Sequence, residues 1–174
     1  MTCDPMLSDK STWHSYLPIY RELFARYRDA AAVLEIGVCA GGSMLMWREY
    51  FKKAQVIGVD VAERPAALIG RNDIVHIQAS AYEHATINGL RGYPPLSVIV
   101  EDGTHYENDM QFVCEHYGHL LEPGGLLVLE DVQDMAWLPG LIAKLPKDWF
   151  SAVIDLRHVK GRYDDVLLCA WRPE

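Results

Sequence analysis

Two apolar stretches in the second half of the chain are each followed by residues that can ligate a metal or move a proton. The stretches cover residues 96–100 and 125–129, and the residues that follow them are Glu101, Asp102 and His105, then Glu130 and Asp131. If both stretches are parallel strands of one sheet, these side chains meet at its carboxyl edge. Like charges are costly to gather unless a cation joins them, and oxygen-rich clusters suit Mg²⁺ or a similar hard divalent ion. The sequence therefore predicts a metal site at this edge.

A site of this kind is suited to activating an alcohol. A hydroxyl group is a poor nucleophile at neutral pH, and a divalent ion on its oxygen lowers the pKa of that hydroxyl. Histidine is the side chain that ionises near neutral pH, so His105 is suited to take the released proton. General-base assistance is typically worth about 10²–10⁴ in rate.

Ordinary structural roles are the alternative for the same residues. Asp102 is suited to an Asx turn that caps a helix beginning near Glu107, and Glu130 with Asp131 is suited to a helix N-cap and first turn. A histidine such as His105, taken alone, is more often a surface or capping residue. These readings explain each residue separately but not their convergence.

Glycines in the first third of the chain predict a nucleotide-type cofactor site. An apolar run at 33–36 ends in Gly37, Gly41 and Gly42, which open a helical stretch, and the next apolar run ends at Asp60. Glycines let the backbone approach a ligand, a helix N-terminus offers N–H groups, and an acid one strand away accepts hydrogen bonds from a ribose diol. The spacing is not the G-x-G-x-x-G of dinucleotide binders, which speaks against a nicotinamide oxidoreductase. The alternative is that the glycines form only a tight turn and Asp60 only a cap.

The spacing Glu-x-Gly-x-x-x-Gly, carried by Glu35, Gly37 and Gly41, resembles the signature of class I methyltransferases that use S-adenosylmethionine (SAM). In that family the segment after the third strand usually contacts the adenine ring, and here that segment is 78–80. The resemblance implies a cofactor-binding set of Glu35, Gly37, Gly41, Ser43, Asp60, Gln78, Ala79, Ser80 and Glu101. SAM carries an activated methyl group, so such a protein mainly aligns the accepting atom with the methyl carbon and sulfur.

A second resemblance is more specific. The string Asp-Gly-Thr-His at 102–105, followed by Pro-Gly-Gly at 123–125 and by Glu-Asp at 130–131, is similar to the metal-dependent sugar O-methyltransferases of macrolide and related antibiotic pathways. The segment Ser-Asp-Lys-Ser-Thr-Trp-His at 8–14, with Tyr16 and Tyr20, resembles the Thr-Asp-Lys…His…Tyr segment of that family. The match covers about residues 8–135, although Glu101 stands where the family more often has Asp.

This second resemblance implies roles for individual residues. Asp102, Glu130 and Asp131 would ligate Mg²⁺, and His105 would be the general base, so that Asp102 and His105 form the catalytic pair. On the substrate side the expected residues are Lys10, His14, Tyr16 and Trp137. For His14 a helix-start role is the alternative, and for Trp137 the expectation is a place at the substrate mouth.

Apolar runs and helical patterns alternate after residue 30, which is typical of a parallel sheet with crossover helices. Strands are expected near 32–37, 55–60, 73–78, 96–101, 125–130, 150–156 and 165–171. Helices are expected near 16–28, 43–53, 81–90, 107–121 and 137–145. The connection between the last two strands, 158–165, is too short for a crossover helix, so these strands should form an antiparallel hairpin. The predicted fold is a Rossmann-like methyltransferase sheet of seven mostly parallel strands.

A chain of 174 residues fits a single domain with a full core. Within it, residues 1–30 are expected to form an N-terminal segment and helix that cover the active site, and 31–174 the SAM-binding domain. The net charge of −8 with scattered Lys and Arg argues against nucleic acid or an anionic membrane as partner and favours a neutral small molecule. The four cysteines show neither a C-x-x-C pair nor zinc spacing, and no targeting or membrane segment is recognised, so we expect a cytoplasmic protein.

The leading hypothesis is a SAM-dependent O-methyltransferase, Mg²⁺-dependent, that acts on a hydroxyl of a sugar or similar small natural product and forms a homo-oligomer. A metal-independent enzyme that methylates nitrogen or a carboxylate is the second reading. The third is a SAM-binding partner subunit without catalysis, against which the costly acidic cluster argues.

Overall fold

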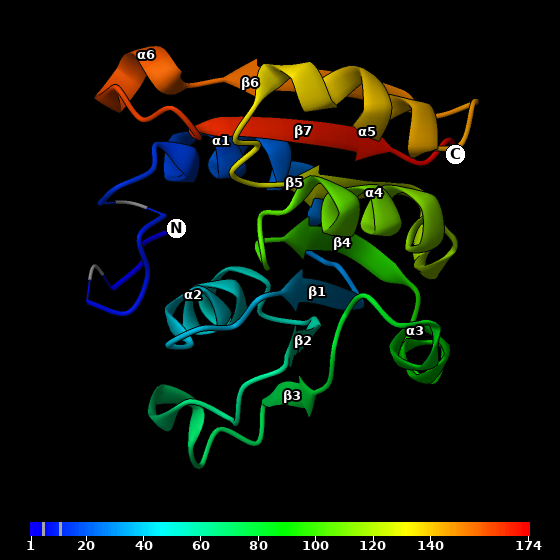
Figure 1. Ribbon diagram of the computed structural model, residues 1–174. Coiled ribbons are helices and arrows are strands. Elements are labelled where there is room, and N and C mark those ends of the chain that lie inside the picture. Colours follow the sequence, from blue (N-terminus) through cyan, green and yellow to red (C-terminus); the bar gives the residue numbers. More distant parts are fainter. Residues whose placement is uncertain (5, 11) are drawn as a thin grey trace.

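The computed structural model describes residues 1–4, 6–10 and 12–174. Seven strands form one sheet in the order β3-β2-β1-β4-β5-β7-β6 (Figure 1). Their bounds are β1 (Ala32–Ile36), β2 (Gln55–Asp60), β3 (Ile74–Gln78), β4 (Leu96–Glu101), β5 (Leu121–Leu129), β6 (Phe150–Asp155) and β7 (Val166–Trp171). The pairs from β3 to β5 are parallel, whereas β7 is antiparallel to both β5 and β6. The Rossmann-like sheet and its C-terminal hairpin are therefore confirmed.

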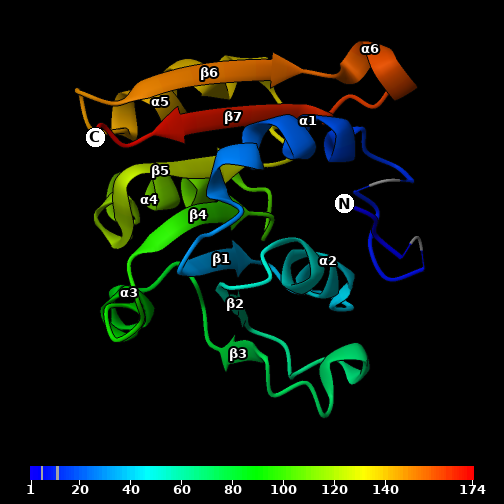
Figure 2. The ribbon, with the colours of Figure 1, turned by 180° about the vertical axis from the view of Figure 1, so that it is seen from behind.

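Helices cover both faces of the sheet. Their bounds are α1 (Tyr16–Leu23), α2 (Gly42–Tyr50), α3 (His84–Leu90), α4 (Glu107–His116), α5 (Leu138–Lys144) and α6 (Arg157–Lys160). Side chains of α3, α4 and α5 pack in one hydrophobic cluster with one face of the strands, and those of α1 and α2 pack in a second cluster with the other face. Figure 2 shows α1 and α2 together on their side of the sheet. None of the helices in the described residues is long and apolar enough to cross a membrane.

Several helix boundaries differ from the sequence prediction, and the expected helix 43–53 ends at Tyr50. The expected helix 16–28 ends at Leu23 and continues as a 3₁₀ turn, and the expected helix 107–121 ends at His116 in the same way. The expected helix 81–90 begins only at His84, because the preceding residues form a turn in which the N–H of Tyr82 donates to Ser80 Oγ. The connection 158–165 holds a single helical turn, α6, which Gly161 ends at a φ of +71°. Boundaries of short helices depend on such local hydrogen bonds more than on hydrophobic period.

Gly37 follows β1 at the carboxyl edge of the sheet. Of the glycines in the chain, it leaves the least room for an added side chain. Its φ is +85°, and a Cβ atom there would lie 1.9 Å from the carbonyl oxygen of Asp102. We expect Gly37→Ala to lower the free energy of unfolding by about 3–5 kcal/mol, because strain in the left-handed region adds to a backbone clash. Gly70→Ala is the matched control, since Gly70 has a φ of +80° and nothing within 4 Å of the added atom.

Urea unfolding of both variants measures the difference. The control is expected to lose only about 1–2 kcal/mol, which is the cost of the left-handed conformation alone. Equal losses in the two variants would show that the close approach of Asp102 to Gly37 is not present in solution.

Candidate active site

The acidic residues reach the same place because side chains alternate along a strand. On β1, Val33 faces the α1 and α2 side, so Glu35 faces that side as well. The same alternation carries Asp102 beyond β4 and Glu130 beyond β5 to that side, since Val100 and Val128 belong to its cluster. One carboxylate oxygen of each of these three residues lies within 4.8 Å of the other two. Asp102 and Glu130 are therefore brought together at the carboxyl edge of the sheet, and Glu35, which was expected on the cofactor side, joins them.

Lys10 lies at the centre of these three carboxylates. Its side chain is 1% exposed, and Nζ donates to both carboxylate oxygens of Glu130 at 2.8 and 2.7 Å and also to Asp102. Nζ is 3.5 Å from an oxygen of Glu35. Burial lowers the pKa of Lys10, but the surrounding carboxylates outweigh it and hold that pKa well above the usual range. An ammonium ion of the chain itself therefore offsets part of the negative charge of the inner acidic group.

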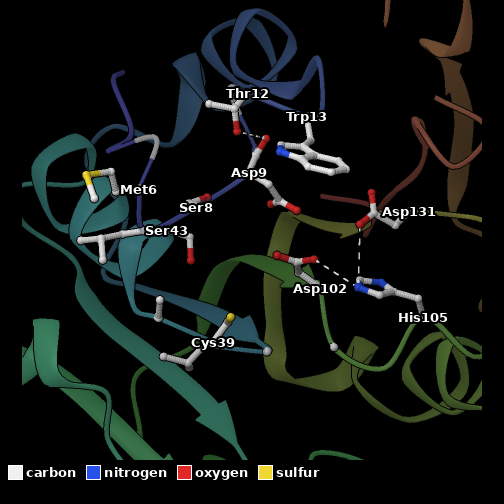
Figure 3. A pocket seen from close by; sticks show the side chains of 15 residues that line it. Met6, Ser8, Asp9, Thr12, Trp13, Cys39, Ser43, Asp102, His105 and Asp131 are labelled. Atoms are coloured by element: carbon white, nitrogen blue, oxygen red, sulfur yellow. Dashed lines mark hydrogen bonds and ion pairs between the residues drawn. The ribbon is translucent and has the colours of Figure 1, made fainter. Parts of the chain in front are cut away.

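A second, outer group faces the cavity shown in Figure 3. It consists of Asp102, His105 and Asp131, whose ligand atoms all lie within 4.8 Å of one another. Nε2 of His105 is 3.8 Å from a carboxylate oxygen of Asp102 and 3.8 Å from one of Asp131. Burial and the charge of Asp102 raise the pKa of Asp131 to about 7. Two carboxylates and an imidazole facing one point are a donor set that a divalent cation can use.

Backbone strain and an unpaired atom mark the same outer group. His105 and Asp131 have φ values of +56° and +54°, which side-chain-bearing residues rarely adopt, and Nδ1 of His105 is buried without a hydrogen-bond partner. Such conformations cost about 1–3 kcal/mol each and cluster at functional sites. The donor set, the strain and the orphaned nitrogen together fit a site built for a cation and a reacting group.

Two buried residues near the N-terminus, His14 and Tyr16, contact the carboxylate of Asp131. The hydroxyl of Tyr16 donates to Asp131, and Nδ1 of His14 lies 3.2 Å from an oxygen of Asp131 and 3.4 Å from one of Asp165. The His14 and Tyr16 rings stack with centroids 4.9 Å apart. Both residues are buried and neither lines the cavity of Figure 3, so they position an acid of the site.

The glycine loop is folded around the Asp60 carboxylate. Asp60 accepts hydrogen bonds from the backbone N–H groups of Val38 and Cys39 at 2.7 and 3.1 Å and of Ala62 at 2.8 Å. Burial raises the pKa of Asp60, and these three hydrogen bonds outweigh it, so the pKa is below its usual value. A carboxylate has about four acceptor positions, so one remains for a ligand hydroxyl.

Two cavities adjoin at this loop. The larger, of about 450 Å³, is the one in Figure 3, and it extends from the glycine loop to the outer acidic group and the N-terminal segment. The smaller, of about 140 Å³, lies between the ends of β1, β2 and β4 and is lined by Asp60, Val61, Ala79 and Tyr82 among others. Gly37 and Gly103 line both. A ligand with a nucleoside end and a reactive end can therefore span them.

Ser43 and Glu35 connect the glycine loop to the acids. Ser43 lines the larger cavity, and its hydroxyl donates to Glu35 at 2.6 Å. Burial raises the pKa of Glu35 to about 7, although Lys10 acts in the opposite direction. Gly41 is the N-cap of α2 at a φ of +87°, so it shapes the loop.

Several predicted site residues line neither of these two cavities. Glu101 points to the opposite side of the sheet, where it accepts from the Tyr82 hydroxyl at 2.8 Å and from the N–H of Gly103 at 3.2 Å. The side-chain amide of Gln78 donates to the carbonyl of Val61 at 3.4 Å. Ser80 takes part in the turn before α3. Ala79 does line the smaller cavity.

Trp137 is not brought to the substrate mouth. It lies in the 3₁₀ turn 135–137 and packs against the hydrophobic cluster that α4 and α5 share. The side chain is partly buried there, and it does not line the cavity of Figure 3. The structure therefore does not support the expected substrate contact.

Sequence reasoning missed three contributions to the site. The counter-ion role of Lys10 and the cavity position of Trp13 depend on the path of an irregular segment, although both lie in the motif 8–14. Tyr82 was missed because nothing in its local sequence connects it with Glu101. The alternation of apolar residues on β4 could have indicated the orientation of Glu101.

The arrangement defines a Rossmann-like domain with a cofactor groove and an acidic reaction site at the carboxyl edge of its sheet. A protein family described as a methyltransferase domain matches residues 34–132, which is more than half of the chain. The chain belongs to this methyltransferase family.

Among individual curated proteins, the chain is similar to several O-methyltransferases. The chain is 34% identical over 140 residues to the 8-demethyl-8-alpha-L-rhamnosyl tetracenomycin-C 2'-O-methyltransferase of Streptomyces olivaceus, covering 75% of this chain and 36% of that protein. It is 29% identical over 136 residues to the mycinamicin VI 2''-O-methyltransferase of Micromonospora griseorubida, covering 73% of this chain and 33% of that protein. The chain thus spans about a third of the length of these relatives.

Solved structures agree with the fold. The MycE methyltransferase from the mycinamycin biosynthetic pathway, in complex with Mg, SAH and mycinamycin VI, superposes with a TM-score of 0.65 at 29% identity. That alignment covers 75% of this chain and 35% of MycE. An O-methyltransferase from Bacillus cereus in complex with SAH, at 16% identity and a TM-score of 0.67, has the same fold over 91% of this chain and 83% of its own.

Proposed function

We propose that this chain is a SAM-dependent O-methyltransferase that transfers a methyl group to a sugar hydroxyl of a glycosylated small molecule. The observation that carries the proposal is the adjoining pair of cavities, one at Asp60 and the other ending at the outer acidic group, with Gly37 and Gly103 lining both. The similarity to enzymes named for rhamnosyl and mycinamicin O-methylation supports the acceptor class.

In this proposal the cofactor spans the two adjoining cavities. Asp60 would accept a hydrogen bond from the ribose, and Val61, Ala79 and Tyr82 would enclose the adenine. The sulfonium end would then lie near Gly37, which lines both cavities. Mg²⁺ would be held by Asp102 and Asp131, where it would lower the pKa of the acceptor hydroxyl and fix its position.

His105 supplies the proton acceptor in this proposal. Its Nε2 faces the same point as the two carboxylates, and its Nδ1 is buried. The carboxylates of Asp102 and Asp131 orient the imidazole and stabilise the imidazolium that forms when the hydroxyl loses its proton. Glu130 is the third metal ligand implied by the resemblance, and it would join the outer group only if Lys10 withdrew from it.

Lys10 also favours a second candidate. Because the Lys10 ammonium ion already offsets part of the charge of the inner acids, methyl transfer without a metal ion is chemically feasible at this site. Turnover that survives a chelator would select this reading. A cytoplasmic location, homo-oligomerisation and the covering role of residues 1–30 remain predictions that accompany either candidate.

Ligand-induced stabilisation tests the cofactor and the metal together. We expect S-adenosylhomocysteine (SAH) at 100 times its Kd to raise the Tm by about 5–10 °C, since that occupancy adds about 2.7 kcal/mol. Mg²⁺ should raise the Tm further in the wild type but not in Asp131→Asn. NAD⁺ is the control nucleotide. A shift with NAD⁺ alone, or none with SAH, would refute the proposed function.

A further inference from the structure

Trp13 is an exposed aromatic residue at the mouth of the reaction cavity. Its side chain lines the 450 Å³ cavity together with Asp102, His105 and Asp131 (Figure 3), and the residue is 62% exposed. A tryptophan that served the core would be buried. This side chain instead presents a large apolar surface beside the outer acidic group.

The backbone around Trp13 is fixed on both sides. The carbonyl of Asp9 accepts hydrogen bonds from the N–H groups of Thr12, Trp13 and His14 at 3.0, 2.9 and 3.0 Å. Nζ of Lys160 donates to the carbonyls of Thr12 and His14 at 3.1 and 2.6 Å. The indole is therefore carried by a compact turn that α6 clamps in place.

The ring itself is also oriented. The guanidinium of Arg162 lies over the Trp13 ring, 5.1 Å from its centroid, and Arg162 donates to Asp164 at 3.0 Å. A cation on an aromatic face adds a modest attraction and favours ring orientations that keep this contact. The exposed remainder of the indole borders the cavity in a defined position, which is what a binding platform needs.

Side chains with hydrogen-bond acceptors line the cavity beside the Trp13 ring. The carboxylate of Asp9 is 60% exposed and lines the same cavity, as does Thr12. The electron-rich face of an indole attracts C–H groups with slight positive charge, and a carboxylate accepts hydrogen bonds from hydroxyl groups. A sugar ring offers both on one small molecule, with C–H groups on a face and hydroxyls at the edge.

We propose that Trp13 is the platform on which the sugar ring of the acceptor stacks, with Asp9 accepting hydrogen bonds from its hydroxyls. This proposal rests on the proposed function and adds the part of the chain that recognises the sugar. A ring seated on Trp13 would direct a hydroxyl toward Asp102, His105 and Asp131, which line the same cavity. Trp13 is thus a specificity-determining residue that takes no part in the proton transfer.

The test uses the SAH-loaded protein, Mg²⁺ and methyl α-L-rhamnopyranoside as the probe. With the five tryptophans labelled with ¹⁵N, the indole signal that disappears in Trp13→Phe identifies Trp13. We expect titration with the glycoside to shift that signal selectively. Trp13→Ala should raise the Kd for the glycoside about tenfold, and Trp13→Phe much less. Phe150→Ala, which removes an aromatic residue that is 67% exposed and lines a different cavity, should leave the Kd unchanged.

The outcomes separate this proposal from the proposed function. SAH should stabilise Trp13→Ala as much as the wild type, because the ring does not line the smaller cavity. If SAH binds but the glycoside does not shift the Trp13 signal, or binds Trp13→Ala equally well, the platform is refuted and the function stands. If catechol shifts the signal and the glycoside does not, the surface takes an aromatic ring and the proposal is also overturned. Loss of the SAH effect in the wild type would instead refute the function.

Discussion

Asp102→Asn is expected to lower the rate of methyl transfer about 10³-fold while SAH binding is retained. Asp102 is the one residue that belongs to both acidic groups, since it pairs with Lys10 and also faces His105. Asparagine keeps the shape of the side chain but removes the charge that would hold the cation and stabilise the imidazolium. The loss should therefore fall on the chemical step and on metal binding.

The experiment compares SAH formation on a rhamnosylated acceptor with the thermal shift given by SAH alone. Asp109→Asn is the matched control, because Asp109 lies on the neighbouring helix α4 with its carboxylate bonded to Thr104 Oγ1 at 2.6 Å. The control should keep its activity within a few-fold. Equal loss of turnover and of SAH stabilisation in Asp102→Asn would show that the cofactor and metal functions are not divided between the two cavities as proposed.

The sheet was predictable because its central strands are mostly apolar and buried, as β1 and β4 show along their whole length, whereas the edge strands β3 and β6 are only partly buried. The turn and helix signals between the strands place them in sequence. The convergence of Asp102 and Glu130 followed from the rule that parallel strands end at one edge. The direction of each side chain followed from alternation, which also separates Glu101 from the other acids.

The N-terminal segment was less predictable, because its described residues before α1 form no helix or strand and several of their contacts are with distant parts of the chain. Lys10 reaches Glu130 across 120 positions, and Leu7 packs so closely on Gly42 that a Cβ there would lie 2.5 Å from the Leu7 backbone. Contacts of this kind leave no periodic pattern in the local sequence. The sequence therefore indicated a motif at 8–14 but not which residues of the site each of its side chains contacts.

Lys10→Met is expected to lower the free energy of unfolding by about 3–5 kcal/mol, which is the usual cost of removing one partner from a buried ionic group. Methionine fills much the same space, so the loss reports the charge. Glu35 and Glu130 are each about 1% exposed and would remain in the interior without a cation. Lys144→Met is the control, because its pair with Glu115 is on the surface, with both side chains more than 40% exposed, and should cost less than about 1 kcal/mol.

The pH dependence of the stability loss in Lys10→Met shows whether Lys10 stabilises the protein through its charge or through its packing. Burial already raises the pKa of Glu35 to about 7 and also raises the pKa of Glu130, while Lys10 lowers both, so removal of Lys10 should raise both pKa values further. The folded variant then binds more protons than its unfolded chain, so its stability should increase as the pH falls from 8 toward 5. The deficit relative to the wild type is expected to be largest near pH 8 in urea unfolding without metal. A deficit that stays constant across this range would mean that Lys10 acts through packing and that the inner carboxylates do not depend on its charge.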